Sequence, residues 1–553
     1  MCTKKRLTVL IPFLNEGEEV VTTVQEVRRT VGNEVDIVVV NDGSTDNWDY
    51  ERLLQPYNVD YISNPQNLGS APSRDICMSK CETPYFLFLD AHMRFYENNW
   101  HTKLINLLNQ NSRRILCAQT ICLEKNDQGT VTRTQEQQKT YGAYMPLLVG
   151  DNIPDIKWNN IEFNPNASME AIPYVLGAAY AGSVEYWNYL KGMQGLKKYG
   201  CEEQYISIKA WLDGGGCYIL KNFKVGHIYR KKSPYLHHTT QELYNYLFIS
   251  STLLPPTLKA KAFATMYSKY DTQYKNIITI LHNESNTIEK LSKYYKKLNA
   301  FDFSYFLNLN KKIRYSLILK ELNDYIPYLP IMAEHMVKHI SPKICLSEGN
   351  IGQYLWLKIY HKLAGTYDEH YNHELGNVIT HIITDGQHLP LSSYCELGWV
   401  LIILYEHEIT QEIPFEALYF IDDYINHSDI TDKRIVNVPQ VFLILLAYIN
   451  IRIKLSYTRN IHYRLNQDKI IQLKDTTNTL KIKYKQNLKL LNQIFVFEEY
   501  IRNNVDSEPT SFSDVLSFKI GFPQNSKYWG HNISAPNNST TLLLMLTLLN
   551  LKQ

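Results

Sequence analysis

The sequence predicts an α/β domain at the N-terminus followed by an all-α region. Short apolar strand signals alternate with helical spacing over roughly the first 125 residues. From about Thr240 onward glycine becomes rare and helical periodicity dominates, without a strand-rich block. Such an alternation is typical of a doubly wound, mostly parallel sheet, in which ligands bind at the carboxyl ends of the strands.

The elements of the α/β part follow one another in a regular order. Strand signals lie at residues 7–12, 35–40, 59–62 and 85–90, and helical spacing lies at residues 16–30 and 71–81. The β-branched run 35–40 is broken only by Asp36, as expected for a strand that is covered on both faces. Polar or acidic side chains follow three of the strands, at residues 12–16, 41–46 and 90–92, so we expect the ligand site there.

Helical spacing continues through most of the remaining chain, for example at residues 277–281, 350–362 and 441–451. We therefore predict three parts. Residues 1–240 form the α/β domain, residues 241–340 a helical connector, and residues 341–553 an all-α domain.

Composition excludes several classes of protein. The 57 Lys and Arg against 55 Asp and Glu leave a formal charge of +2, so we expect no nucleic-acid partner. Hydrophobic residues at 44% and charged residues at 20% are typical of a folded globular chain. Nine cysteines without CxxC spacing argue against a disulfide framework or a structural zinc site. We therefore expect a cytoplasmic protein with reduced thiols; the sequence does not indicate its oligomeric state.

No segment satisfies the sequence criteria for a membrane span. The apolar run 7–14 is too short for a signal peptide and leads into Asn15 and Glu16. The later runs 441–449 and 542–551 fall short of the roughly 20 residues that a span needs, so we expect no transmembrane segment. The run 542–551 could instead form an interfacial or partner-facing helix.

An Asp-x-His motif, Asp90-Ala91-His92, ends the apolar strand signal at residues 85–90. Side chains two residues apart on an extended chain point to the same side, so both can reach one cation. A carboxylate oxygen beside an imidazole suits Mn²⁺, with Mg²⁺ as the alternative. Taken alone, the motif more often marks a strand end with solvated polar residues than a metal site.

Further motifs, in a fixed order, resemble those of known glycosyltransferases. Residues 9–16 (Val-Leu-Ile-Pro-Phe-Leu-Asn-Glu) and 40–46 (Val-Asn-Asp-Gly-Ser-Thr-Asp) resemble glycosyltransferase family 2. The Asp-x-His motif and residues 225–230 (Val-Gly-His-Ile-Tyr-Arg) are similar to those of the polypeptide N-acetylgalactosaminyltransferases. The resemblance covers about residues 6–235. It implies the GT-A fold, a Rossmann-like fold of nucleotide-diphospho-sugar transferases, and a UDP-sugar donor.

The resemblance also implies three groups of site residues. The metal would be held by Asp90, His92 and His227. The donor would be contacted by Pro12, Glu16, Asp42, Arg74, Gly177, Ala178 and Tyr199. The reaction would involve Glu202, Glu203 and Arg230.

Individual roles follow from the same resemblance. Asp42 would receive the uracil, Glu202 would bind sugar hydroxyls, and Gly177 and Ala178 would let the sugar pass close to the backbone. Arg230 and the metal would stabilise negative charge on the departing diphosphate, so that protonation of the leaving group is unnecessary.

Some positions depart from the family pattern. Tyr199 stands where the related enzymes have Trp, and Ala178 and Cys201 stand where they have Gly, so the sugar cannot be copied from the family. The position of Glu203 is not acidic in the retaining N-acetylgalactosaminyltransferases, whereas inverting relatives place their catalytic carboxylate there. Glu203 is thus either a general base or a residue that binds the acceptor or caps the helix. The anomeric outcome stays open.

The helical region carries a fainter resemblance. Residues 347–352 and 394–399 resemble helix-start segments of lanthionine synthetase C-type proteins, over about residues 345–430. No Cys/Cys/His zinc set follows Cys395, so the resemblance implies a non-catalytic domain that binds a peptide or another subunit. A generic helical scaffold is the alternative.

Together these observations predict a metal-dependent glycosyltransferase that moves a hexose or N-acetylhexosamine from a UDP-sugar to Ser, Thr or Cys of a peptide or protein. Two alternatives are a family 2 transferase with a lipid-linked or polysaccharide acceptor and a non-catalytic nucleotide-sugar-binding module.

Overall fold

The computed structural model describes residues 5–126, 128–133, 140–146, 153–230, 239–298, 303–322, 326–327, 329–338, 349–366, 373–374, 376–377, 379–381, 384, 389–410, 414–458 and 461–503. The chain forms two compact units. The first unit contains Met1–Leu147, Asn152–Leu254 and Tyr270–Ile313, and the second contains Leu148–Asp151, Pro255–Lys269 and Arg314–Gln553. The functional division predicted at residues 240 and 340 stays a prediction.

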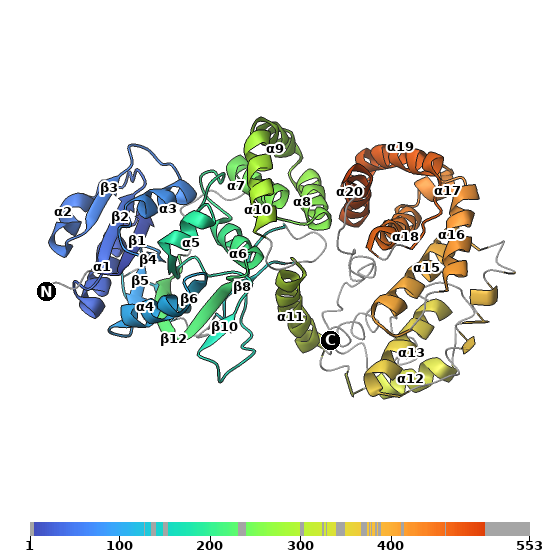
Figure 1. Ribbon diagram of the computed structural model, residues 1–553, viewed down its shortest axis with the longest axis horizontal. Helices are drawn as coiled ribbons and strands as arrows, with labels where there is room; N and C mark the ends of the chain where they lie inside the picture. The colour runs from blue at the N-terminus through green and yellow to red at the C-terminus, as the bar shows by residue number, and fades with distance from the viewer. Residues whose placement is uncertain are drawn as a thin grey trace. The chain divides into compact units, whose positions relative to one another are not determined.

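A mixed ten-stranded sheet forms the centre of the first unit (Figure 1). Eight strands lie in the order β10-β12-β6-β11-β4-β1-β2-β3, while β5 pairs with β12 and β7 pairs with β6. These strands are β1 (Leu7–Phe13), β2 (Asp36–Asn41), β3 (Asp60–Ser63), β4 (Tyr85–Leu89), β5 (Met93–Phe95), β6 (Ile115–Lys125), β7 (Val131–Arg133), β10 (Met169–Ala171), β11 (Ala179–Ser183) and β12 (Cys217–Ile228). A separate two-stranded sheet pairs β8 (Ala143–Tyr144) with β9 (Lys157–Trp158).

The predicted α/β elements are confirmed. The four strand signals correspond to β1, β2, β3 and β4, and the pairs β1–β2, β1–β4 and β2–β3 are parallel. The two helical signals correspond to α1 (Glu18–Val31) and α3 (Ser70–Ser79). The strand that follows β4 in the sheet, β11, is antiparallel to it, so the sheet is not parallel throughout.

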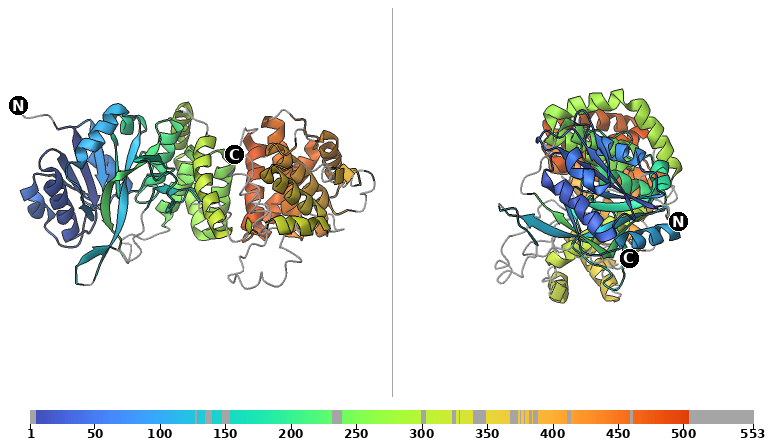
Figure 2. Two further views of the ribbon diagram at one scale, coloured as in Figure 1. Left: turned by 90° about the horizontal axis from the view of Figure 1, so that it is seen from below. Right: turned by 90° about the vertical axis from the view of Figure 1, so that its left-hand side faces the viewer.

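Apolar side chains cover both faces of the sheet, which explains the uninterrupted apolar strand sequences. On one face, alternate residues of β1 such as Val9 and Ile11 form a core with Val24 of α1 and Leu104 of α4 (Trp100–Gln110). On the other face, Phe88 of β4 lies 5.2 Å, between ring centroids, from Trp187 of α5 (Val184–Tyr189). Figures 1 and 2 show the helices on the two sides of this sheet.

Further helices complete the first unit. They are α2 (Tyr50–Leu54) with the short 3₁₀ helix Gln55–Tyr57, α6 (Glu202–Leu212), α7 (Thr240–Thr252), α9 (Asp271–Asn283), α10 (Ser285–Lys297) and the first half of α11 (Phe303–Leu322). Helix α10 is tied to α6 by a hydrogen bond of 2.8 Å between the hydroxyls of Tyr205 and Tyr295, both buried.

All regular elements in the described part of the second unit are helices, as predicted. Its helices are α8 (Pro256–Lys269), α12 (Leu329–Lys338), α13 (Asn350–Ala364), α15 (Leu391–Glu406), α16 (Phe415–His427), α17 (Lys433–Val436), α18 (Pro439–Thr458), α19 (Gln467–Lys483) and α20 (Leu488–Asn503). Packing runs from α13 to α15, α18, α20 and α8, while α12, α16, α17 and α19 pack against this row from outside. The resemblance of this region to lanthionine synthetase C-type proteins stays a prediction.

The expectation of no transmembrane segment was wrong as stated. Among the described residues, one helix is long and apolar enough to cross a membrane: the window Pro439–Ser456 of α18 has a mean hydropathy of 1.3. Its apolar sequence is interrupted by Asn450, Arg452 and Lys454. The uninterrupted apolar run is therefore short, although the mean hydropathy of the whole window is high. A buried core helix passes the same test, and 78% of this window is buried inside the protein. The run 542–551 lies outside the described residues.

A buried ion pair links α16 to α18. Arg452 donates to Asp422 at 2.6 Å and 3.2 Å, and both side chains are fully buried. The Tyr448 hydroxyl donates to the same carboxylate at 2.8 Å, and Arg452 also donates to the His462 carbonyl at 3.0 Å. Removal of the cation would leave a buried, uncompensated carboxylate.

We predict that Arg452→Leu lowers the free energy of unfolding of the helical unit by about 3–5 kcal/mol, because the Asp422 charge loses its counter-charge. Guanidinium denaturation followed by circular dichroism measures the change. The control is Arg434→Leu, since the Arg434–Asp432 pair lies at the surface, with Arg434 90% exposed. Equal effects of the two substitutions would contradict the assignment.

Candidate active site

A cleft of about 580 Å³ lies where β1, β2 and β4 end. Eleven of the thirteen predicted site residues line it: Pro12, Glu16, Asp42, Arg74, Asp90, His92, Tyr199, Glu202, Glu203, His227 and Arg230. The other two, Gly177 and Ala178, are not among its lining residues. The carboxyl ends of the strands thus bring together residues that are up to 218 positions apart in the sequence (Pro12 to Arg230).

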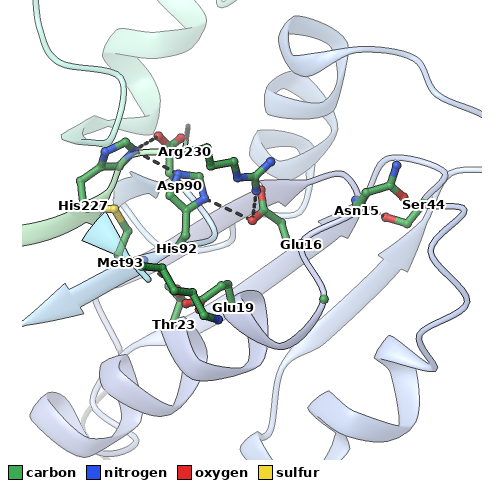
Figure 3. A network of polar contacts seen from close by, with 12 residues as sticks. Asn15, Glu16, Glu19, Thr23, Ser44, Asp90, His92, Met93, His227 and Arg230 are labelled. Carbon is green, nitrogen blue, oxygen red and sulfur yellow. Dashed lines mark hydrogen bonds and ion pairs between the residues drawn. The ribbon is translucent and has the colours of Figure 1, made fainter. Parts of the chain in front are cut away.

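Asp90, His92 and His227 form a compact cluster in this cleft (Figure 3). One potential ligand atom from each residue lies within 4.8 Å of the others. The Nε2 atoms of the two histidines are 3.1 Å apart, and His227 Nε2 is 3.2 Å from Asp90 Oδ2. The register of β12 against β5 places His227 opposite Met93, directly beside His92. Sheet pairing therefore assembles the cluster.

The cluster fits a divalent cation. Two ligand atoms of one ion lie roughly 3 Å apart when each is about 2.1 Å from the metal and they are at right angles. Both measured separations are close to this value. One carboxylate oxygen and two imidazole nitrogens suit Mn²⁺ or a similar metal, and three protein ligands leave coordination positions for a substrate. The Asp-x-His strand end and the later histidine are thus brought to one point.

The environment of the cluster keeps the Asp90 carboxylate ionised and shifts the pKa values of the two imidazoles in opposite directions. Burial would raise the pKa of Asp90, but the hydrogen bond from His227 and the charges of His92 and Arg74 lower it below its ordinary range. Burial would lower the pKa of His92, yet the contact with Glu16 raises it. Burial lowers the pKa of His227, which keeps this imidazole neutral near pH 7. A neutral imidazole and an ionised carboxylate are the forms that bind metals.

Arg74 stands between the metal cluster and the acidic pair of α6. Its guanidinium is 3.9 Å from Asp90 and 4.0 Å from Glu203, and its side chain is only 5% exposed. The aromatic faces of Phe88 and Tyr180 lie 5.2 Å and 5.4 Å from it. Because a planar cation packs well against aromatic rings, Arg74 can remain charged in this buried position.

Glu202 and Glu203 begin helix α6 (Glu202–Leu212). Cys201, directly before them, has the left-handed φ of +75° and lies buried. The Glu202 carboxylate turns back and accepts the Gly200 N–H at 3.0 Å, while the Glu203 side chain remains 21% exposed toward the cleft. Burial and the neighbouring Glu202 charge raise the pKa of Glu203 to about 7. A carboxyl group with this pKa can accept a proton near neutral pH.

Gly177 and Ala178 lie beside residues of the cleft, and their predicted contact with a sugar stays a prediction. A Cβ atom at Gly177 would overlap the Glu203 carboxylate, lying 2.9 Å from its Cδ. Ala178 is 4% exposed within the apolar core, and its carbonyl accepts the Asp90 N–H at 3.0 Å. Both residues therefore support cleft residues from behind.

The Asp42 carboxylate anchors a loop. It accepts four hydrogen bonds, from the side chains of Asn64 and Asn67 and from the backbone N–H groups of Leu68 and Gly69, at 2.8–3.1 Å. A carboxylate offers about four lone-pair positions, so this set occupies it. The predicted contact of Asp42 with uracil would require exchange of one of these bonds.

One wall of the cleft has no signature in the sequence. It is formed by Asp155, Trp158, Glu242 and Tyr246. The Tyr246 hydroxyl donates to Asp155 at 2.9 Å, and the Trp158 ring, 44% exposed, packs edge-to-face on Tyr229 at 5.3 Å. These residues lie on β9, on helix α7 and in an irregular segment, where neither periodicity nor a motif marks them.

We predict that Gly177→Ala destabilises the first unit by about 1–3 kcal/mol, because the new methyl group displaces the Glu203 carboxylate. In a Glu203→Ala background the same substitution should cost no more than about 0.5 kcal/mol, since the overlap is gone. Thermal and denaturant unfolding of the four proteins measures this coupling. Gly376→Ala serves as the control, because no atom lies within 4 Å of a Cβ built there. Identical costs in both backgrounds would contradict the contact.

The N-terminal part of this chain is similar to one protein family and to several known proteins. Residues 8–160 match the family described as glycosyl transferase family 2. Polypeptide N-acetylgalactosaminyltransferase 10 of Rattus norvegicus is 27% identical over 245 residues, which are 42% of this chain and 39% of the relative. Teichoic acid poly(glycerol phosphate) polymerase of Staphylococcus epidermidis is 31% identical over 90 residues, 16% of this chain and 12% of the relative.

A solved structure described as "Crystal structure of GalNAc-T7 with UDP, GalNAc and Mn2+" has 19% sequence identity and a TM-score of 0.44, covering 55% of this chain and 56% of that chain. The chain spans about two-fifths of the length of the N-acetylgalactosaminyltransferase described above. The N-terminal part of the chain is therefore similar to glycosyl transferase family 2 and to the polypeptide N-acetylgalactosaminyltransferases, and its mixed, Rossmann-like sheet is the arrangement expected of the GT-A fold.

Proposed function

We propose that the protein is a divalent-metal-dependent glycosyltransferase that moves a hexose or N-acetylhexosamine from a UDP-sugar to a hydroxyl or thiol of a peptide or protein. The observation that carries the proposal is the convergence of Asp90, His92 and His227, with Glu203 and two arginines in the same cleft. The relatives support it, because the name polypeptide N-acetylgalactosaminyltransferase says that those proteins act on polypeptides.

The chain's own residues would divide the reaction between them. When bound, Mn²⁺ would neutralise negative charge on the diphosphate. Arg230 would approach the same charge from the end of β12, and Arg74 lies beside Asp90. The bond between the anomeric carbon and the phosphate oxygen breaks, and its electron pair leaves with UDP. The acceptor oxygen or sulfur forms the new bond and gives its proton to Glu203.

Glu203 suits the role of proton acceptor for two reasons. Its carboxylate faces the cleft within 4.0 Å of Arg74, and its pKa is raised to about 7 by burial and by Glu202. Glu202 is engaged with the Gly200 backbone and would bind substrate hydroxyls from a fixed position. A base on the acceptor side belongs to direct displacement, so we propose that the product has the inverted anomeric configuration.

His227→Ala should abolish Mn²⁺-dependent hydrolysis of the UDP-sugar donor, because it removes one of three metal ligands, while the unfolding midpoint changes little. UDP release by the purified variant measures this effect. The matched control is His282→Ala in α9, away from the cleft. Wild-type hydrolysis by His227→Ala would exclude His227 as a ligand.

The transfer rate should depend on pH through Glu203. Because the ionised carboxylate is the base, kcat/KM should rise with pH up to about 7 and level off above it. Glu203→Gln should lower kcat/KM by about 10²-fold or more and remove this limb. Initial rates at saturating Mn²⁺ separate the effect from metal binding, and NMR of the product gives the anomeric configuration. A normal rate for Glu203→Gln, or a retained configuration, would contradict the base assignment.

A further inference from the structure

A single carboxylate oxygen contacts both a metal-cluster histidine and the cleft arginine. Glu16 Oε2 is 3.2 Å from His92 Nδ1 and forms an ion pair with the Arg230 guanidinium. The Glu16 side chain is only 5% exposed. Figure 3 shows a continuous chain of contacts from Arg230 through Glu16, His92 and His227 to Asp90. Glu16 thus touches the back of the His92 ring, on the side away from His227.

The backbone around Glu16 is fixed from both sides. Asn15 and Gly17 have φ values of +53° and +55°, so the chain turns sharply after β1. The Asn15 N–H donates to Ser44 Oγ at 2.9 Å, and the Asn15 side chain accepts the Thr45 N–H at 2.7 Å. The Gly17 N–H donates to the Tyr50 hydroxyl at 2.8 Å. These bonds hold the Glu16 side chain at a defined place beside His92.

This contact selects one form of the imidazole. A carboxylate can only accept a hydrogen bond, so His92 must carry its proton on Nδ1. The lone pair of the neutral ring then lies on Nε2, the atom that faces His227 Nε2. A carboxylate behind a ligand histidine is known to orient the ring and to raise its basicity.

We propose that Glu16 is a positioning residue, not a donor contact: it fixes the tautomer and orientation of His92 for the metal and holds Arg230 in place until the diphosphate arrives. This inference rests on the proposed metal site. It replaces the role that the family resemblance implied for Glu16, which was to contact the donor.

The ion pair between Glu16 and Arg230 also affects how Arg230 can bind a substrate. The Glu16–Arg230 pair lines both the cleft and a second hollow of about 610 Å³, which is also lined by Glu19, Glu124 and Lys125. Arg230 can reach a diphosphate only by exchanging Glu16 for phosphate. Loss of the Glu16 charge therefore weakens metal binding but leaves Arg230 more available to a free nucleotide. The two effects have opposite signs.

The first measurement is the Mn²⁺ affinity of the full chain, from EPR of free Mn²⁺, for the wild type and for Glu16→Gln and Glu16→Ala. Glu16→Ala should raise the Kd for Mn²⁺ by about 10–100-fold, and Glu16→Gln by less, because the amide oxygen can still accept from Nδ1. Glu19→Gln is the control. Glu19 lies three residues further along the chain, and its carboxylate pairs with Arg94 at 2.7 Å and with Lys125 instead of a cluster histidine.

The second measurement separates positioning from a general structural effect. Nitrogen-15 NMR of the metal-free protein should show His92 protonated on Nδ1 in the wild type and a mixture of tautomers in Glu16→Ala, with His92→Gln used to assign the signal. Calorimetry with UDP and no metal should give an unchanged or tighter Kd for Glu16→Gln.

An unchanged Mn²⁺ Kd and an unchanged tautomer in Glu16→Ala would overturn the inference while leaving the proposed metal site intact. Weaker binding of metal-free UDP by Glu16→Gln, with normal Mn²⁺ affinity, would also overturn it and return Glu16 to the donor cleft. If the wild type binds no Mn²⁺, both the proposed metal site and this inference fail.

Discussion

The antiparallel pairing of β5 with β12 is the constraint on which the candidate site depends. Its register places Gly226 opposite Arg94 and His227 opposite Met93, and the Ile228 N–H donates to the His92 carbonyl at 3.2 Å. A Cβ at Gly226 would lie 2.5 Å from the Tyr96 hydroxyl and 2.6 Å from a methyl of Leu123, so a larger residue there would push these two side chains aside. A slip by one residue would turn His227 to the opposite face of the sheet. The cluster of Asp90, His92 and His227 is thus a product of strand register.

Around this cluster, positive and negative side chains alternate through the cleft. Arg230, Glu16 and His92 contact one another in turn, and Arg74 lies within 4.0 Å of both Asp90 and Glu203. Each of these side chains lies beside one of opposite charge, which stabilises ionised groups in a partly buried cleft. The arrangement leaves Glu203 as the group whose proton affinity is raised into the neutral range. The cleft thereby separates groups suited to hold a metal from a group suited to accept a proton.

The sequence predicted much of the fold and most of the cleft, for identifiable reasons. Parallel strands such as β2 are buried on both faces, so their apolar runs stand out, and polar residues directly after them mark the ligand edge.

The sequence did not predict which site residues are buried or which hydrogen bonds join distant segments. Asp42 lies where the motif predicts a donor contact, but the loop at residues 64–69 occupies its carboxylate. Ala178 is in the core, and the Asp155–Tyr246 wall joins segments 91 residues apart without any local pattern. In α18, charged residues that form ion pairs inside the helical unit interrupt the apolar sequence. The high mean hydropathy of the whole helix was therefore not recognised from the sequence.

The central claim is that Asp90, His92 and His227 hold one divalent cation in the cleft. Crystals of the protein soaked with MnCl₂ and UDP, measured at a wavelength where manganese scatters anomalously, test it most directly. The account predicts a single strong anomalous peak bonded to Asp90, His92 and His227, with the diphosphate on its open side and Arg230 turned toward the phosphates. Clear density for UDP with no peak among these three residues, or with the manganese bound elsewhere, would contradict it.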